Sequence, residues 1–180
     1  MLLVLNGAPG VGKSTLADRY ADEHALSLVI DVDAIRQQLG RWDTVEESKV
    51  VARDLAVTLA RAHLERGHDV VVAQYIGRPE LLEQLRSLAA EADTRFVEVV
   101  LTDDGDRIAE RFRLRRADHV SGGIKHPEAD LPEDAIATEV AAANERLLRD
   151  AAARDAAVIS VAGGPDRSFA ELLRTLGSSG

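Results

Sequence analysis

The sequence predicts an α/β protein of three layers: a five-stranded parallel sheet, helices on both of its faces, and a small helical lid. Short apolar runs alternate with helical runs along the 180 residues, which is typical of a parallel sheet. The runs are nearly continuous in aliphatic residues, as at 70–72, and this indicates strands buried on both faces. The chain has no internal repeat and no linker, so we expect one domain over residues 1–180.

The apolar runs place strands at residues 2–6, 28–31, 69–75, 95–101 and 157–161. Helices are expected at 13–25, 34–39, 46–66, 79–92, 104–117, 132–154 and 168–176. Apolar residues at helical spacing support the helix at 46–66, namely Val51, Leu55, Leu59 and Ala62. Gly67 is suited to end that helix and Pro79 to begin the next. Glycine, proline and polar residues make 118–131 a loop, the moving part of a lid at about 113–132, and we expect a disordered tail at 177–180.

Composition and charge exclude several classes of protein. The net charge is −9, from 22 Lys and Arg against 31 Asp and Glu, and non-specific binding of duplex nucleic acid needs the opposite sign. Without cysteine the chain has no disulfide, thiolate zinc site or cysteine nucleophile. No apolar run approaches the roughly 20 residues of a membrane span, and the first one is too short for a signal peptide. We therefore expect a cytoplasmic protein without a membrane partner.

A phosphate-binding motif follows the first strand. The run Gly7-Ala8-Pro9-Gly10-Val11-Gly12-Lys13-Ser14 matches GxxxxGK[ST], the P-loop pattern, and it leads into a helix as that motif requires. Its backbone amides and the helix N-terminus form an anion site. Lys13 would reach the β- and γ-phosphates, and the Ser14 hydroxyl would bind Mg²⁺. The sequence predicts an ATP·Mg²⁺ site that extends to Thr15.

Two aspartates and an arginine follow the second strand, in Asp31-Val32-Asp33-Ala34-Ile35-Arg36. One of the two carboxylates can orient Mg²⁺ or its waters, the other can accept a proton from an attacking hydroxyl, and Arg36 can hold the acceptor. The alternative is structural, since either aspartate is a good N-cap and Arg36 can be a solvated helix residue.

The P-loop followed by Asp-x-Asp-x-x-Arg resembles the small P-loop kinases. These include shikimate and gluconate kinases, polynucleotide 5′-kinases and chloramphenicol phosphotransferase. The resemblance implies the P-loop NTPase fold, makes Asp33 the catalytic base, and gives Asp31 a part in Mg²⁺ binding.

The segment after the third strand departs from that pattern. Many relatives carry an acidic residue where this chain has Gln74 and Tyr75. We assign both to acceptor binding together with Arg78 and, from the loop after the second helix, Trp42, since aromatic rings line many pockets. Tyr75 as a core aromatic, Gln74 as a strand cap and Trp42 as a loop anchor are the alternatives.

Five arginines fall within ten residues of the helix after the fourth strand: Arg107, Arg111, Arg113, Arg115 and Arg116. They form either a solvated face or a phosphate clamp that leads into the lid, and the clamp uses the bidentate, permanent charge of arginine. The preceding Asp103-Asp104 fits a helix N-cap better than a Walker B acid pair. The resemblance gives Arg111 a contact with ATP and Arg115 a contact with the transferring phosphate.

The loop after the fifth strand contains Gly163, which the resemblance places against adenine, and the chain has no guanine-reading motif. The sequence thus predicts an ATP-dependent kinase with a small-molecule hydroxyl acceptor, for which a nucleoside-type or other antibiotic is one candidate. A polynucleotide 5′-hydroxyl kinase and a regulatory ATPase remain the alternatives, and the chain can be a monomer or a homodimer.

Overall fold

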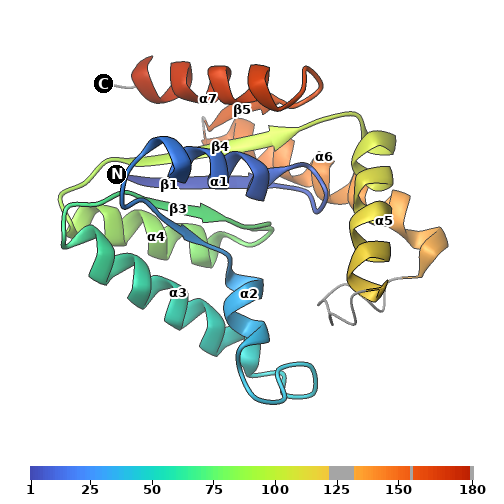
Figure 1. Ribbon diagram of the computed structural model, residues 1–180, viewed down its shortest axis with the longest axis horizontal. Helices are drawn as coiled ribbons and strands as arrows, with labels where there is room; N and C mark the ends of the chain where they lie inside the picture. The colour runs from blue at the N-terminus through green and yellow to red at the C-terminus, as the bar shows by residue number, and fades with distance from the viewer. Residues whose placement is uncertain (122–131, 155, 179–180) are drawn as a thin grey trace.

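A five-stranded sheet, with every strand parallel, forms the centre of the protein (Figure 1). The computed structural model describes residues 1–121, 132–154 and 156–178. The strands lie in the order β2-β3-β1-β4-β5. They are β1 (Leu2–Gly7), β2 (Leu28–Ile30), β3 (Val70–Ala73), β4 (Phe96–Thr102) and β5 (Ala157–Ser160). This arrangement confirms the predicted α/β fold with three layers.

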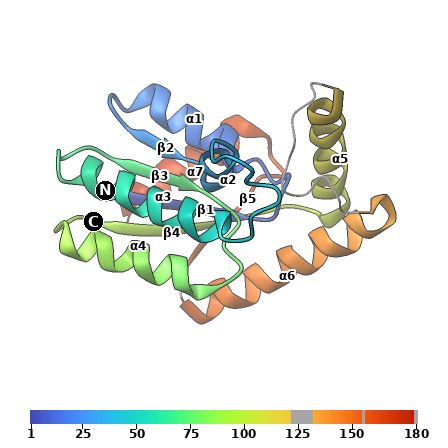
Figure 2. The same ribbon diagram turned by 90° about the horizontal axis from the view of Figure 1, so that it is seen from below.

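Helices cover both faces of the sheet (Figures 1 and 2). They are α1 (Lys13–Glu23), α2 (Val32–Gln37), α3 (Ser48–Leu64), α4 (Pro79–Glu91), α5 (Gly105–Ser121), α6 (Ile136–Arg154) and α7 (Pro165–Ser178), with a 3₁₀ turn η1 (Glu133–Ala135) before α6. Successive side chains of a strand point to opposite faces, so Leu3 packs with Leu16 of α1 and Phe169 of α7. Leu2 packs in a second cluster with Ala56 of α3 and Leu85 of α4.

The buried face of α3 is offset by one residue from the stripe of larger apolar residues that the sequence shows. Val51, Leu55 and Leu59 are exposed, whereas Ala52, Ala56, Ala60 and Leu64 are buried against the sheet. Small alanines let the helix backbone approach the strands closely, and the larger apolar residues remain outside. Gly67 has a φ of +80° just beyond the helix, as expected for a helix stop.

Several boundaries differ from those expected. The third strand ends at Ala73, which leaves Gln74 and Tyr75 in a loop. Helix α5 continues beyond 117 to Ser121, so the expected loop at 118–131 begins as helix, and its remainder lies outside the described residues. Helix α7 begins at Pro165 and includes Gly177 of the expected tail.

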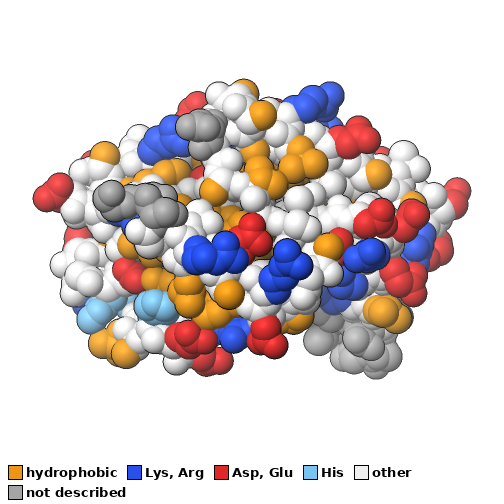
Figure 3. Space-filling model, turned by 90° about the horizontal axis from the view of Figure 1, so that it is seen from above, with side chains coloured by type: hydrophobic (Ala, Val, Ile, Leu, Met, Phe, Trp, Pro, Cys, Tyr) orange, Lys and Arg blue, Asp and Glu red, His pale blue; other side chains and the backbone are white. Residues whose placement is uncertain are grey.

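Surface charge on the face over α1 and α7 is mixed (Figure 3). Lys and Arg side chains are interspersed there with Asp and Glu. A broad basic surface of the kind that holds duplex nucleic acid is not present on this face. Within the described parts of the chain, every helix is too short or too polar to cross a bilayer.

Candidate functional site

The P-loop connects β1 to α1 at the carboxyl edge of the sheet, where parallel α/β folds bind ligands. Gly10 and Gly12 have φ values of +87° and +105°, in the left-handed region that favours glycine. Gly12 is the N-cap of α1, and no side chain within the described ranges caps this helix. The first backbone N–H groups of α1 are therefore suited to a phosphate.

Close packing accounts for the glycine at position 10. A Cβ there would lie 2.7 Å from the Ile108 carbonyl oxygen and 3.0 Å from Phe112 Cβ. Helix α5 thus packs directly on the loop. At Gly7 a Cβ would lie 2.7 Å from Val11 Cγ1. Both positions require glycine, and this keeps the loop compact enough to cradle a phosphate.

The Lys13 side chain folds back onto the loop that precedes it. Its Nζ donates hydrogen bonds to the carbonyl oxygens of Gly7 at 2.9 Å and Ala8 at 3.1 Å. Ser14 and Thr15 follow in the exposed first turn of α1. The loop, Lys13 and the first turn of α1 thus lie together, and their contacts with ATP and Mg²⁺ stay predictions. The Ser14 hydroxyl, an oxygen ligand of the kind that Mg²⁺ uses together with substrate phosphates, lies beside this cradle.

An ion pair between Arg111 and the buried carboxylate of Asp103 ties α5 to the P-loop. Arg111 donates from Nε to the Gly10 carbonyl oxygen at 3.0 Å and from a terminal nitrogen to Asp103 Oδ2 at 2.7 Å. The Asp103 side chain is 1% exposed. Its burial acts to raise the pKa, but hydrogen bonds from Arg111 and the Asp104 backbone N–H, with the charges of Arg111 and Arg107, lower the pKa of Asp103 below its usual value. Arg111 therefore holds the P-loop against α5.

Asp104 is the N-cap of α5, as the sequence predicts. Its Oδ1 accepts hydrogen bonds from the backbone N–H groups of Asp106 at 3.1 Å and Arg107 at 3.3 Å. Asp103 takes no part in this cap, because it serves Arg111.

The remaining arginines of α5 have different surroundings. Arg113 pairs with Glu133 at 2.9 Å and Arg116 lies 4.0 Å from the same carboxylate, as on a solvated helix face. The Arg115 guanidinium carbon lies 5.6 Å from the centre of the Phe112 ring. The phosphate contact of Arg115 stays a prediction.

Asp31 and Asp33 have separate tasks in the structure. Asp31 is the N-cap of α2, and its Oδ1 accepts from the backbone N–H groups of Asp33 at 2.8 Å and Ala34 at 3.0 Å. Asp33 Oδ2 accepts a hydrogen bond from Gln74 Nε2 at 3.0 Å. The capping alternative thus describes Asp31, whose part in Mg²⁺ binding stays a prediction.

Arg36 anchors the loop that follows α2. It donates from Nε to Ser48 Oγ at 2.9 Å and from NH2 to the Trp42 carbonyl oxygen at 3.1 Å. Ser48 Oγ also donates to that carbonyl oxygen at 2.7 Å, and the Arg36 guanidinium lies 5.1 Å from the centre of the Trp42 ring. The loop-anchor alternative describes Trp42, which does not line the adjacent cavity.

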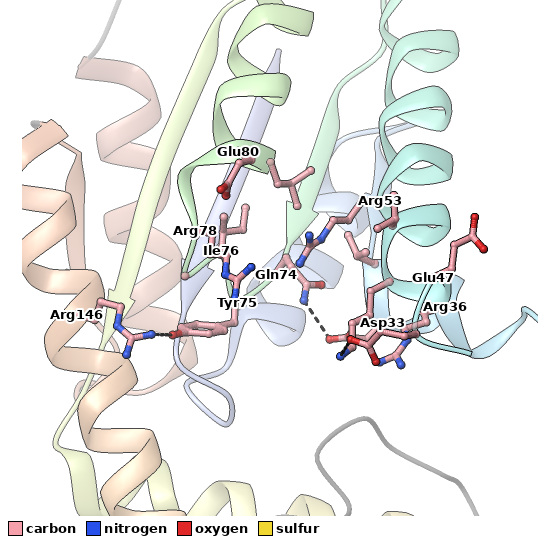
Figure 4. A pocket seen from close by; sticks show the side chains of 16 residues that line it. Asp33, Arg36, Glu47, Arg53, Gln74, Tyr75, Ile76, Arg78, Glu80 and Arg146 are labelled. Atoms are coloured by element: carbon pink, nitrogen blue, oxygen red, sulfur yellow. Dashed lines mark hydrogen bonds and ion pairs between the residues drawn. The ribbon is translucent and has the colours of Figure 1, made fainter. Parts of the chain in front are cut away.

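A cavity of about 670 Å³ opens beside Asp33 (Figure 4). This volume suits a small molecule. Five predicted acceptor residues line it: Asp33, Arg36, Gln74, Tyr75 and Arg78. The other lining residues come from α2, the loop before α3, α3, the loop after β3, the start of α4, and α6: Val32, Glu46, Glu47, Lys49, Val50, Arg53, Ile76, Gly77, Glu80, Leu81 and Arg146.

Tyr75 closes one side of the cavity. Arg146 NH1 donates to its hydroxyl oxygen at 3.5 Å, and its ring packs against the cluster of Val100, Leu147 and Ala151. Tyr75 therefore packs as a core aromatic residue and also forms part of the cavity wall. Sequence reasoning missed Arg53 and Arg146, since a single arginine within a long helix carries no local signal.

A buried polar network joins the P-loop to the loop that lines the cavity beside Asp33. Asn6 is 0% exposed. Its Oδ1 accepts from the backbone N–H groups of Gly7 and Ile76, both at 2.9 Å, and its Nδ2 donates to the Ile76 carbonyl oxygen at 3.2 Å and to Glu98 Oε1 at 3.4 Å. Arg154 donates to both Glu98 carboxylate oxygens, at 2.8 and 3.1 Å. The network fixes the loop after β3 relative to the cradle.

Gly163 lies between β5 and α7, where a Cβ would meet the side chain of Arg167. Its neighbour Gly164 has a φ of +86°. The adenine contact of this loop stays a prediction.

Comparison with known proteins identifies the family. The AAA domain family matches residues 2–145 of the chain. The chain belongs to this family. Two curated relatives of this AAA domain are kinases. An adenylate kinase of Natronomonas pharaonis is 28% identical over 140 residues, which cover 73% of this chain and 66% of the relative. An L-seryl-tRNA(Sec) kinase of Methanococcus maripaludis is 29% identical over 105 residues, which cover 56% and 40%.

The chain thus spans less than two thirds of the length of these relatives. Among solved structures, the PezAT toxin-antitoxin system of Streptococcus pneumoniae aligns with a TM-score of 0.60 and 16% identity, over 84% of this chain and 64% of that one. The APS kinase CysC of Mycobacterium tuberculosis aligns with a TM-score of 0.51 and 20% identity, over 80% and 96%. These structures confirm the fold, and the kinases among the relatives fit the resemblance to the small P-loop kinases.

Proposed function

We propose that the chain is an ATP·Mg²⁺-dependent kinase that phosphorylates a hydroxyl group of a small molecule held in the cavity beside Asp33. The observation that carries this proposal is the position of Asp33. Its carboxylate lines the cavity and is held by Gln74 at 3.0 Å. β1 and β2 both flank β3 in the sheet, so Asp33, Gln74 and the P-loop all follow carboxyl ends of neighbouring strands.

The reaction divides between the cradle and the cavity. The P-loop amides and Lys13 would hold the phosphates of ATP, with Arg111 and Gly163 as further ATP contacts and Arg115 on the transferring group. Ser14, with Asp31 nearby, would hold Mg²⁺, which neutralises charge on the phosphates when bound. The acceptor oxygen forms a bond to the γ-phosphorus, the bond to the β-bridging oxygen breaks, ADP departs, and the hydroxyl proton passes to Asp33.

The carboxylate favours a hydroxyl over a phosphate as the reacting group of the acceptor. A hydroxyl can donate its hydrogen to Asp33, and the proton has an acceptor when the bond to phosphorus forms. A phosphate in the same place would bring its negative charge against the carboxylate. Although one curated relative is an adenylate kinase, the charge at Asp33 supports an alcohol acceptor here.

Transfer of label from [γ-³²P]ATP·Mg²⁺ to pooled acceptors tests the proposal. The pools hold nucleosides, sugars, hydroxy acids, aminoglycoside and nucleoside-type antibiotics, and 5′-hydroxyl oligonucleotides. We expect label in a small-molecule pool, and ATP turnover that rises when that acceptor is added. Label that appears only as free phosphate, at a rate no acceptor changes, would contradict the proposal and favour a regulatory ATPase.

Lys13→Ala provides the control for the cradle. We expect it to lower kcat/KM for ATP by about 100-fold or more, the usual effect of losing a charge-stabilising donor. Lys49→Ala removes a lysine from the cavity rim and should leave the affinity for ATP unchanged. Normal turnover by Lys13→Ala would refute the assignment of the cradle.

A further inference from the structure

The acceptor cavity holds more cationic side chains than its own structure uses. Two of the five basic lining residues are engaged locally. Lys49 pairs with Glu46 at 2.8 Å, and Arg36 binds Ser48 and the Trp42 carbonyl oxygen. This leaves Arg53, Arg78 and Arg146, which come from α3, the start of α4 and α6.

These arginines lack carboxylate partners. Within the described part of the chain, Arg53 and Arg78 form no ion pair or hydrogen bond, and Arg146 reaches only the uncharged Tyr75 hydroxyl, at 3.5 Å. Acidic partners are not scarce, because the chain has 31 Asp and Glu against 22 Lys and Arg. Elsewhere arginines have such partners, as in the pair of Arg61 and Glu91 at 2.7 Å.

The arginines face the cavity from different sides (Figure 4). Arg53 and Arg78 extend toward Gln74 from α3 and from the start of α4, and Arg146 lies beside Tyr75. The exposed Glu47 directs its carboxylate away from this group. Asp33 lies on the α2 side. Glu46 and Glu80 line the cavity as well, and Glu46 is paired with Lys49. The cavity therefore has Asp33 at one end and the three guanidinium groups toward the other, where Glu80 also lines it.

We propose that the acceptor carries an anionic group, a carboxylate or a phosphate ester, in addition to the hydroxyl that is phosphorylated. This inference rests on the proposed function and names the substrate class of the same site. Guanidinium groups match the oxygens of both anions, and an anion placed among Arg53, Arg78 and Arg146 relieves their mutual repulsion. Asp33 repels the same anion, so the acceptor is oriented with its hydroxyl at Asp33 and its charge at the arginines.

Calorimetric titration tests this assignment without depending on phosphate transfer. The protein is first saturated with AMPPNP and Mg²⁺, so that the anionic probes cannot occupy the P-loop. The probes are matched pairs: hydroxy acids with their amides, and sugar or nucleoside monophosphates with their unphosphorylated forms. We expect the anionic member of at least one pair to bind about 10-fold or more tightly than its neutral counterpart, as for hydrogen bonds to a charged group. The pair that shows this preference tells a carboxylate from a phosphate ester.

Variants connect the preference to the arginines. Arg53→Gln, Arg78→Gln and Arg146→Gln should each weaken binding of the anionic probe by about 10-fold while leaving the neutral member unchanged. Arg78→Lys should bind the anionic probe more tightly than Arg78→Gln but less tightly than the wild type. Lysine keeps the positive charge but lacks the planar, bidentate guanidinium group. Arg149→Gln is the matched control, since Arg149 is an exposed residue of α6 outside the cavity lining.

Three results would overturn the inference: equal or tighter binding of the neutral members, no binding by any probe, or an anion preference that survives all three glutamine variants. A labelled neutral acceptor would likewise refute it while leaving the kinase proposal intact. Conversely, an arginine-dependent anion preference without transfer of label to any acceptor would support the binding site and contradict the kinase proposal. Failure of the inference and failure of the proposed function are therefore distinguishable.

Discussion

Gln74 donates a hydrogen bond from Nε2 to Asp33 Oδ2 over 3.0 Å, across 41 residues of sequence. This bond connects the loop after β3 to α2 and leaves the other carboxylate oxygen of Asp33 for the acceptor. An amide fits this place because it can donate to a carboxylate. A carboxylate in this place would face Asp33 with like charge.

Gln74→Glu should lower kcat because it replaces the donor to Asp33 with a second carboxylate. We expect a loss of about 10-fold or more, the usual effect of removing a hydrogen bond to a charged group, while KM for ATP stays unchanged. Steady-state kinetics with the acceptor found in the label assay measures the change. Gln38→Glu, on the exposed C-cap of α2, is the control, and an equal loss in both variants would contradict the role of Gln74.

Three Gly→Ala variants should lower the free energy of unfolding by different amounts, most at Gly10 and least at Gly40. Gly10→Ala combines a φ of +87° with a Cβ 2.7 Å from the Ile108 carbonyl oxygen, so it should cost at least about 2 kcal/mol of unfolding free energy. Gly12→Ala has the unfavourable φ but an open position, and should cost about 1–2 kcal/mol. Gly40→Ala, also in open space, should stay within about 0.5 kcal/mol of the wild type. Urea unfolding gives the order, and a cost for Gly10→Ala no greater than for Gly40→Ala would refute the close packing of α5.

Asp103→Asn should destabilise the protein at neutral pH by about 1–3 kcal/mol, as expected when a buried charged hydrogen bond is lost. Since the pKa of Asp103 is lower in the folded than in the unfolded protein, its stabilisation is complete above the unfolded pKa and is lost as pH falls through the folded pKa. The difference from the wild type should be constant from pH 7 to 5 and shrink below about pH 4. Urea unfolding across this range measures it, with Asp106→Asn as the exposed control. A difference that grows on acidification would contradict the direction of the pKa shift.

Asn6→Ala should loosen the loop after β3 as well as lower stability. It removes the acceptor for two backbone N–H groups, those of Gly7 and Ile76, and a buried unpaired group costs about 1–3 kcal/mol. Hydrogen exchange should speed up at the Ile76 amide. Asn144→Ala is the matched buried control and should leave exchange at Ile76 unchanged. Among the residues that the structure describes, Asn144 accepts only from Thr102 Oγ1, at 3.1 Å. Unchanged exchange in both variants would argue against the coupling.

Local patterns in the sequence were sufficient to predict most of the fold. The alternation of apolar and helical runs predicted the parallel sheet, and the P-loop motif predicted the cradle. The spacing of Val51, Leu55 and Leu59 predicted helix α3 correctly, but these larger side chains do not form its buried face. The buried stripe consists mostly of alanines. Alanines face the sheet because α3 lies close to the strands, and the spacing of residues along one helix does not reveal that distance.

The candidate site was predictable where a motif carries it. Lys13, Asp33 and Gln74 follow strand ends and could be found by inspecting what comes after each strand. Arg53 and Arg146 lie far apart in long helices, and only tertiary packing brings them to one cavity. Apart from the adjacent Gly7, the partners of Asn6 and Glu98 likewise lie at least 56 residues away. Cavity residues that lie within long helices thus escape sequence reasoning, whereas those that follow strand ends do not.

Phosphate transfer by Asp33→Asn tests the central claim most directly. The substitution keeps the shape of the side chain and removes the group that accepts the proton. Label transfer from [γ-³²P]ATP·Mg²⁺ to the acceptor is measured in parallel with ATP binding. We predict that transfer by the variant falls by about 100-fold or more while ATP binds with unchanged affinity. Transfer at the wild-type rate would contradict the account, because Asp33 would then be a structural residue of α2 and not the base.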